Sequence, residues 1–195
     1  MNYKQYQDLF DEILNQSVPS TPYDNKQYLE YVKMNQVRMK RWDKTLRLSE
    51  ELLDQLQRMN KKQHWIIITE PWCMEAAHLV PFLIKMAEES DFISYDLQLR
   101  DREPFLISSY LTNGAKGIPK MIVRDEYNND LFIWGPRPGE AQAFRDHLSA
   151  ANTDSEAIKY ALHQWYNTDR GKSLNTEILQ HYSQTNLWSC VFQTQ

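Results

Sequence analysis

Residues 64–69, HWIIIT, are the part of the sequence that most limits how the chain can fold. A short run of β-branched residues bounded by polar ones is typical of a strand buried on both faces. The apolar spacing becomes helical over 73–89, and an alternating strand pattern, FISYDLQL, follows at 92–99. A strand, a helix and a second strand in this order predict a right-handed crossover between two parallel strands.

The next segment extends this unit and completes a sheet. EPFLISSYL (103–111) predicts a short helix, and KMIVRD (120–125) and LFIW (131–134) predict strands joined by the turn EYNND. A helix is expected over 138–151. The order from 64 to 151 is therefore βαβαββα, which predicts an α/β fold with a mixed four-stranded sheet and helices on both faces.

Helical patterns flank this core on both sides. Three amphipathic patterns precede it, with a Ser-, Pro- and Asn-rich linker at 15–25, and two more follow near 154–167 and 174–183. We therefore predict a helical N-terminal extension (1–62), a core (63–151) and a helical C-terminal extension (152–195). A chain of 195 residues fits one compact domain of this kind.

Composition excludes several classes of function. A formal charge of −4 gives no electrostatic case for binding nucleic acid or an anionic membrane. The longest mostly apolar run, AAHLVPFLIKMA, is too short to cross a bilayer, and the first residues contain no apolar signal-peptide core. The two cysteines, Cys73 and Cys190, form no disulfide framework, so we expect a cytoplasmic protein with reduced thiols. The histidines show no metal-ligand spacing with either cysteine, so no metal or cofactor is expected.

Several motifs together resemble one family. PWCMEA follows the buried strand, Pro81 lies eight residues beyond Cys73, and GIPKMIV opens the third strand. This pattern resembles the thioredoxin fold over about 90 residues, and WGPRP (134–138) is similar to a stretch in bacterial thioredoxin-like proteins with a single-cysteine or EDWCGD-type site. The resemblance implies that the Ile118–Pro119 peptide is cis and faces Cys73.

Two positions depart from the family pattern. The second cysteine of the motif is replaced by Ala76, giving a CxxA site, so no intramolecular disulfide can form there. The buried acid that the family places six residues before the first cysteine falls on Ile67. Both losses affect the same step, because that acid serves the second thiol.

Cys73 is the candidate catalytic residue. Unpaired N–H groups at the start of a helix, together with the helix dipole, favour a thiolate, so we expect a lowered pKa, although Glu75 opposes it. Trp72 is expected to shield the sulfur and to contact a partner. His78 is a poor candidate base, since it points about 140° away from Cys73 around the helix. The alternative is that Cys73 is a small buried apolar residue at a helix start.

Four further residues are candidates for substrate binding. In the resembled fold, Ile118 presents its backbone to an extended peptide beside Pro119; alternatively, Pro119 merely begins a strand. Gly135 allows a ligand to approach the backbone closely. Arg137 is expected to pair with a carboxylate, either of a glutathione-like thiol or of Glu75; alternatively, WGPRP is only a rigid turn before a helix.

Three functions remain open. The first is monothiol disulfide exchange through Cys73, with a protein or low-molecular-weight thiol or disulfide as partner and an external resolving thiol. Cys190 is a second source of that thiol, although nothing in the sequence brings it to the site. The second function is a non-catalytic binding module that uses the Ile118–Pro119 groove. The third is a structural role in which helices within 1–60 and 153–184 form an oligomer interface; the oligomeric state itself is left open.

Overall fold

The structure is a computed structural model that describes residues 1–184. At its centre is a four-stranded sheet in the order β2-β1-β3-β4. The strands are β1 (Gln63–Thr69), β2 (Ile93–Leu99), β3 (Lys120–Asp125) and β4 (Asp130–Trp134). β1 and β2 are parallel, whereas β3 is antiparallel to both β1 and β4, so the sheet is mixed, as predicted.

β1 lies in the middle of the sheet because its side chains are apolar on both faces. Trp65 and Ile67 point to one face and Ile66 and Ile68 to the other, and all four are buried. In register, Ile67 lies between Leu97 of β2 and Met121 of β3.

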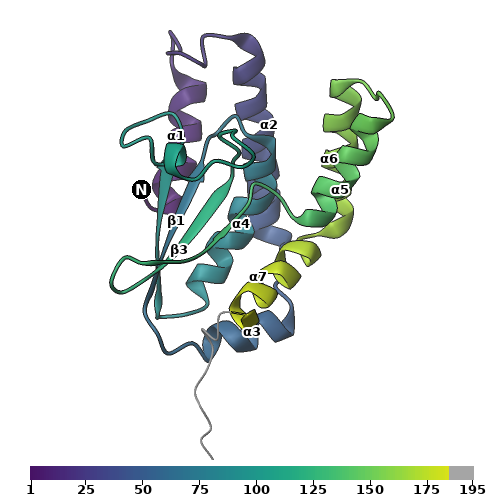
Figure 1. The fold of residues 1–195 in the computed structure, drawn as a ribbon. Helices are drawn as coiled ribbons and strands as arrows, with labels where there is room; N and C mark the ends of the chain where they lie inside the picture. Colours follow the sequence, from purple (N-terminus) through teal and green to yellow (C-terminus); the bar gives the residue numbers. More distant parts are fainter. Residues whose placement is uncertain (185–195) are drawn as a thin grey trace, which may run out of the picture.

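Helix α4 (Met74–Glu88) lies between the sheet and α2 (Lys26–Thr45), and nearly all of its side chains are buried (Figure 1). Trp42 of α2 contacts Phe82 of α4, with ring centroids 5.2 Å apart. The backbone of Gly171 lies directly against Phe82. A Cβ built at Gly171 would be 2.3 Å from the Phe82 ring, and the φ of Gly171 is +79°. Glycine is required here by both the close approach and the backbone conformation.

Residues 100–117 connect β2 to β3. The helix expected at 103–111 is only a 3₁₀ turn, η1 (Leu106–Ser109), because Phe105 has a left-handed backbone with φ 53° and cannot belong to a longer helix. Tyr110 holds this segment to the hairpin: its hydroxyl donates to Asp130 at 2.7 Å and accepts from Arg124 at 2.8 Å. The connection between β2 and β3 is therefore mainly loop structure.

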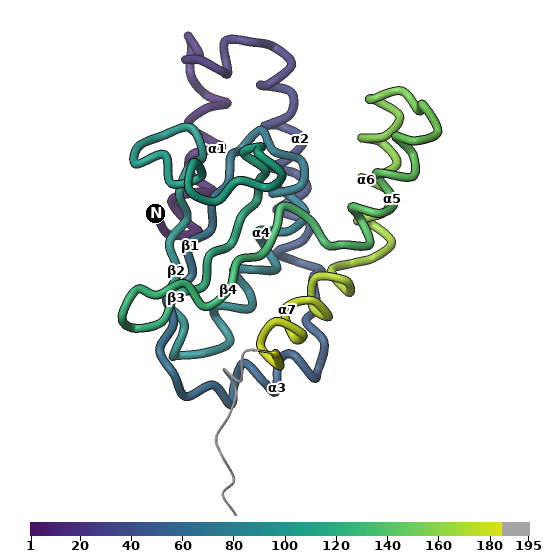
Figure 2. Tube along the Cα trace, viewed as in Figure 1, coloured from purple at the N-terminus to yellow at the C-terminus, as the bar shows by residue number. Residues whose placement is uncertain are grey.

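The flanking helices share the core of the sheet. They are α1 (Tyr3–Asn15), α3 (Glu50–Gln57), α5 (Gly139–Ala150), α6 (Ser155–Asp169) and α7 (Lys172–Gln184). Apolar side chains of α1, α3 and α7 are buried within the chain, including Tyr6, Phe10, Ile13, Leu52, Leu56 and Ile178. α7 lies beside α3, while α5 and α6 form an antiparallel pair that projects from the body (Figure 2). Within residues 1–184, no helix combines the length and apolar character needed to span a bilayer.

Candidate functional site

Cys73 is the N-cap of α4. Its sulfur accepts a hydrogen bond from the backbone N–H of Ala76 at 3.4 Å, where Ser or Asp usually supplies an oxygen. Its own N–H donates to the carbonyl of Glu70 at 3.0 Å. The end of β1 and the first turn of α4 thus fix the position of the thiol.

The structure brings Cys73 and Ile118 together. The thiol donates to the carbonyl oxygen of Ile118 across 3.5 Å, and the Ile118–Pro119 peptide is cis. Ile118 and Pro119 are both buried, and Cys73 is 7% exposed. The site is therefore closed to solvent, and the Ile118 carbonyl that an extended peptide would use already accepts one hydrogen bond, from the thiol.

The expectation that the pKa of Cys73 is lowered is wrong. Burial raises the pKa of the Cys73 thiol to about 12, and the negative charge of Glu75 adds to that effect. The Ala76 N–H and the charge of Arg100 act in the opposite direction but are weaker than burial. Helix N–H groups favour a thiolate, but here they do not compensate for removing the sulfur from water.

Trp72 lies at the rim of the site and is half-buried. Its ring meets Tyr28 of α2 edge-on at 5.6 Å, and the Arg100 guanidinium lies 4.6 Å above its centroid. An aromatic side chain held between a second ring and a cation gains cation–π stabilisation and is fixed in one orientation.

Gly135 has a φ of +111° and lies against the Ile118–Pro119 segment. A Cβ at this position would be 2.3 Å from the carbonyl oxygen of Pro119. The close backbone approach that the glycine permits is thus between β4 and the loop before β3. Lys120, the first residue of β3, donates to the Gly135 carbonyl at 3.3 Å and contacts the Thr112 hydroxyl.

Arg137 pairs with Glu75, one of the two carboxylates considered from the sequence. Its Nε donates to Glu75 Oε1 at 2.9 Å, and its Nη1 donates to Gln142 at 2.6 Å. The hydroxyl of Tyr166 donates to Oε2 of Glu75. Burial raises the pKa of Glu75, and the charge of Arg137 opposes this rise. These contacts connect the first turn of α4 to α6 and to the turn before α5.

His78 belongs to a separate buried group on α4. Its Nδ1 accepts from Trp42 Nε1 at 3.1 Å, so its Nε2–H donates to Nδ1 of His163, 2.7 Å away. Its ring also stacks on Tyr166 at 4.7 Å. Burial lowers the pKa of His78 to about 2, so it is neutral and bonded within the protein.

Glu70 is a titratable residue that the sequence analysis missed. It lies three residues before Cys73, is 4% exposed and accepts from the backbone N–H of Asp101 at 2.9 Å. Burial raises its pKa to about 7. The available signal was a charged residue directly after a buried strand, but the sequence does not show that the charge of Glu70 acts on Tyr6 and Tyr23 of the N-terminal region and raises their pKa values. Among the described residues, no group of three or more His, Cys, Asp or Glu side chains could hold a metal ion.

A mixed sheet, a helix that starts at a cysteine, and a cis-proline segment bonded to that cysteine define a thioredoxin-like protein. A family model described as Thioredoxin matches residues 21–151, and the chain belongs to this family. The match includes α2 and α3 as well as the predicted core.

The wider comparisons add information on the fold alone. No curated protein matches the chain. One similar solved structure is an HIV epitope-scaffold, with a TM-score of 0.53 and 16% identity over 94% of this chain and 98% of that one. Another is a protein of unknown function from Pseudomonas aeruginosa, with a TM-score of 0.47 and 16% identity over 88% of this chain and 99% of that one.

Proposed function

We propose that this thioredoxin-family protein is a non-catalytic binding module in which Cys73 is a structural thiol. The observation that carries the proposal is the closed site: the thiol is buried, bonded to Ile118 and raised in pKa to about 12. Disulfide exchange requires a thiolate. At pH 7 a thiol of this pKa is almost wholly protonated.

The missing partners of the thiol support the same proposal. Ala76 occupies the position of the resolving cysteine, and Ile67 occupies that of the buried acid. Glu75, two residues from Cys73, is bound to Arg137 and Tyr166. The guanidinium of Arg137 is therefore already paired with a carboxylate of the protein itself, that of Glu75.

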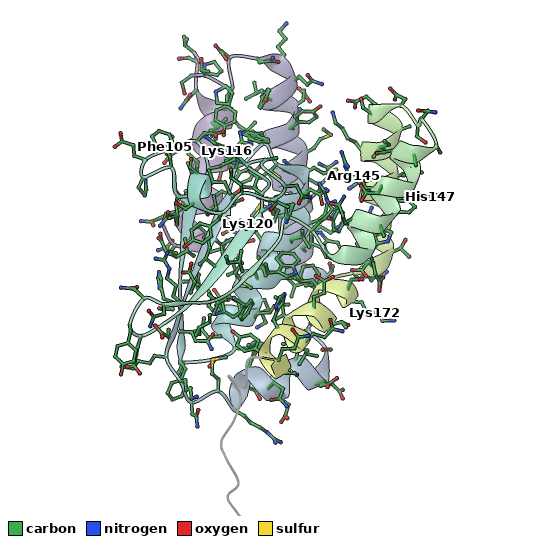
Figure 3. All side chains as sticks on the ribbon, viewed as in Figure 1. Phe105, Lys116, Lys120, Arg145, His147 and Lys172 are labelled. Atoms are coloured by element: carbon green, nitrogen blue, oxygen red, sulfur yellow. The ribbon has the colours of Figure 1, made fainter. Side chains whose placement is uncertain are left out.

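The binding surface in this proposal is the rim next to Cys73, formed by Trp72 with Tyr28 and Arg100. Half-buried aromatic and arginine side chains contribute strongly to protein interfaces. Phe105, 46% exposed, lies on the neighbouring segment 100–117 together with Lys116 (Figure 3). The partner we propose is a cytoplasmic protein that covers this rim.

The experiment compares capture by the wild type and four variants of the purified full-length protein used as bait. We expect Cys73→Ser to capture the same proteins as the wild type, and Trp72→Ala and Arg100→Ala to lose them. Tyr127→Ala, which removes an exposed aromatic from the β3–β4 turn, is the matched control and is expected to behave as the wild type. Loss of capture in Cys73→Ser alone, or equal loss in Tyr127→Ala, would contradict the proposal.

A second candidate, monothiol exchange, is favoured by the position of the Cys73 sulfur beside the Ala76 N–H and the cis-proline segment. In this reaction the thiolate attacks one sulfur of a disulfide, a mixed disulfide forms and the other sulfur leaves as a thiolate. An external thiol, such as that of a protein or a low-molecular-weight compound, then attacks the mixed disulfide and releases Cys73. Intact-mass analysis after incubation with oxidised glutathione tests it: an adduct at Cys73 in the native protein favours this candidate, and its absence favours the binding module.

A further inference from the structure

A groove separate from the thiol site runs between α2 and α6, which face each other in Figure 1. It has a volume of about 390 Å³. The side chains that matter for its chemistry are Lys33, Met34, Val37, Arg38, Arg41 and His163. A groove of this size is in the range that holds a small organic molecule.

The groove contains two guanidinium groups whose charges are not neutralised. Arg38 Nη1 donates to Asn35 Oδ1 at 2.7 Å, and Arg41 Nη2 donates to Asn167 Oδ1 at 2.7 Å. Both partners are neutral amides. Among residues 1–184, neither arginine forms an ion pair with a carboxylate.

The effect of these two charges is seen on their neighbours. Burial and the charge of Arg41 together lower the pKa of Arg38. Burial, followed by the charges of Arg38 and Arg41, lowers the pKa of His163 to about 4. Lys33 adds a further cation, and Glu30 is the one acidic side chain in the lining. The groove is therefore locally positive in a chain whose formal net charge is −4.

Apolar side chains lie next to the cations. Met34 is 41% exposed and Val37 is 65% exposed. Positions 34, 37, 38 and 41 follow the helical spacing that puts them on one face of α2. Exposed apolar surface beside uncompensated cations suits a ligand with an anionic head and an apolar body.

We propose that this groove binds a small amphipathic carboxylate. Its carboxylate is held by Arg38 and Arg41, and its aliphatic chain covers Met34 and Val37. Neither this ligand class nor this surface follows from the proposed function at Trp72. A bound carboxylate would also affect α4. The charges of both arginines act on His163, and His163 is hydrogen-bonded at 2.7 Å to His78 of α4.

The test uses the full-length protein and sodium decanoate, titrated by calorimetry. We expect saturable binding of decanoate, and at least tenfold weaker binding of decanol, which lacks the charge, and of inorganic phosphate, which lacks the chain. Replacing both arginines in Arg38→Gln/Arg41→Gln is expected to weaken decanoate binding about tenfold or more, since hydrogen bonds to charged groups are lost. The matched control Lys40→Gln removes one cation from α2 outside the groove and is expected to have no effect.

Two further measurements keep the test decisive if the arginine variant is unstable. Val37→Glu changes an exposed residue, leaves both arginines in place and is expected to abolish decanoate binding by charge repulsion and loss of apolar contact. NMR titration of His163 is expected to show its pKa rising when decanoate is bound, because the carboxylate offsets both guanidinium charges. Absence of decanoate binding, equal binding of decanol or phosphate, equal loss in Lys40→Gln, or an unchanged His163 titration would each overturn the proposal.

Discussion

The hydroxyl of Tyr166 on α6 donates a hydrogen bond to the buried carboxylate of Glu75 in the first turn of α4. The two residues are 91 positions apart in the chain, so this contact joins the C-terminal helices directly to the helix that begins at Cys73. The other carboxylate oxygen accepts from Arg137. A buried carboxylate needs such partners, because an unpaired charge in the interior is costly.

Tyr166→Phe removes one donor from Glu75 and is expected to lower the free energy of unfolding by about 1–3 kcal/mol, the cost of leaving a buried acceptor partly unpaired. Urea denaturation measures this change. Tyr160→Phe, which removes a hydroxyl from an exposed residue of the same helix, should change stability by less than about 0.5 kcal/mol. Equal effects of the two substitutions would show that the hydroxyl of Tyr166 contributes nothing through Glu75.

Alkylation of Cys73 by iodoacetamide is expected to be slow, and its rate is expected to rise about tenfold per pH unit from pH 7 to pH 10 without reaching a plateau. The reason is that burial raises the pKa of the thiol to about 12. Intact mass, measured in a Cys190→Ser background, gives the rate for Cys73 alone. A plateau below pH 8.5 would mean that the helix N–H groups outweigh burial after all.

Glu70→Gln is expected to remove a pH dependence of stability. In the folded protein the pKa of Glu70 is raised to about 7, against 4.5 for the free side chain. Below pH 4.5 both states are protonated and Glu70 has no effect. Between pH 4.5 and pH 7 the unfolded chain loses the proton while the folded chain keeps it, so stability falls as pH rises and stays lower above pH 7.

The expected difference at pH 8 is at most about 3 kcal/mol in favour of Glu70→Gln, and it should disappear near pH 4. The glutamine retains an oxygen that can accept from the Asp101 N–H. Urea denaturation across this pH range provides the measurement, with Glu126→Gln, at an exposed position, as the matched control. A wild-type-to-variant difference that is constant with pH would refute the assignment of this titration to Glu70.

Gly135→Ala is expected to destabilise the protein by more than about 2 kcal/mol, because the new Cβ would lie 2.3 Å from the carbonyl oxygen of Pro119 in addition to straining the backbone. Gly114 provides the comparison. Its φ is +77°, but a Cβ there meets nothing within 4 Å, so Gly114→Ala should cost only the backbone strain of about 1 kcal/mol. Thermal unfolding of both variants separates steric overlap from strain.

The fold was predictable because its strands carry local signals. The β-branched run at 64–69 indicated a central strand, and it is buried on both faces as β1. KMIVRD coincides with β3, Lys120–Asp125, and the helical spacing after Cys73 corresponds to α4. The helix at 103–111 failed because apolar spacing alone does not report the left-handed backbone of Phe105.

The candidate site was predictable in position but not in electrostatics. Sequence motifs placed Cys73 near Ile118 and offered Glu75 as a partner of Arg137, and both contacts are present. The sign of the Cys73 pKa shift was wrong because it depends on how much protein covers the sulfur. Tyr166 and His163 were missed for the same reason: their helix was predicted, but no local pattern indicates that it packs against α4. Cys190 lies outside the described residues.

Arg137 and Tyr166 both donate to the carboxylate of Glu75; Arg137 lies just before the α5–α6 pair, and Tyr166 lies within it. Lifting that pair away from the body would therefore take both donors from the carboxylate at once. The position of the projecting pair and that of the first turn of α4 are therefore coupled through a single side chain, Glu75.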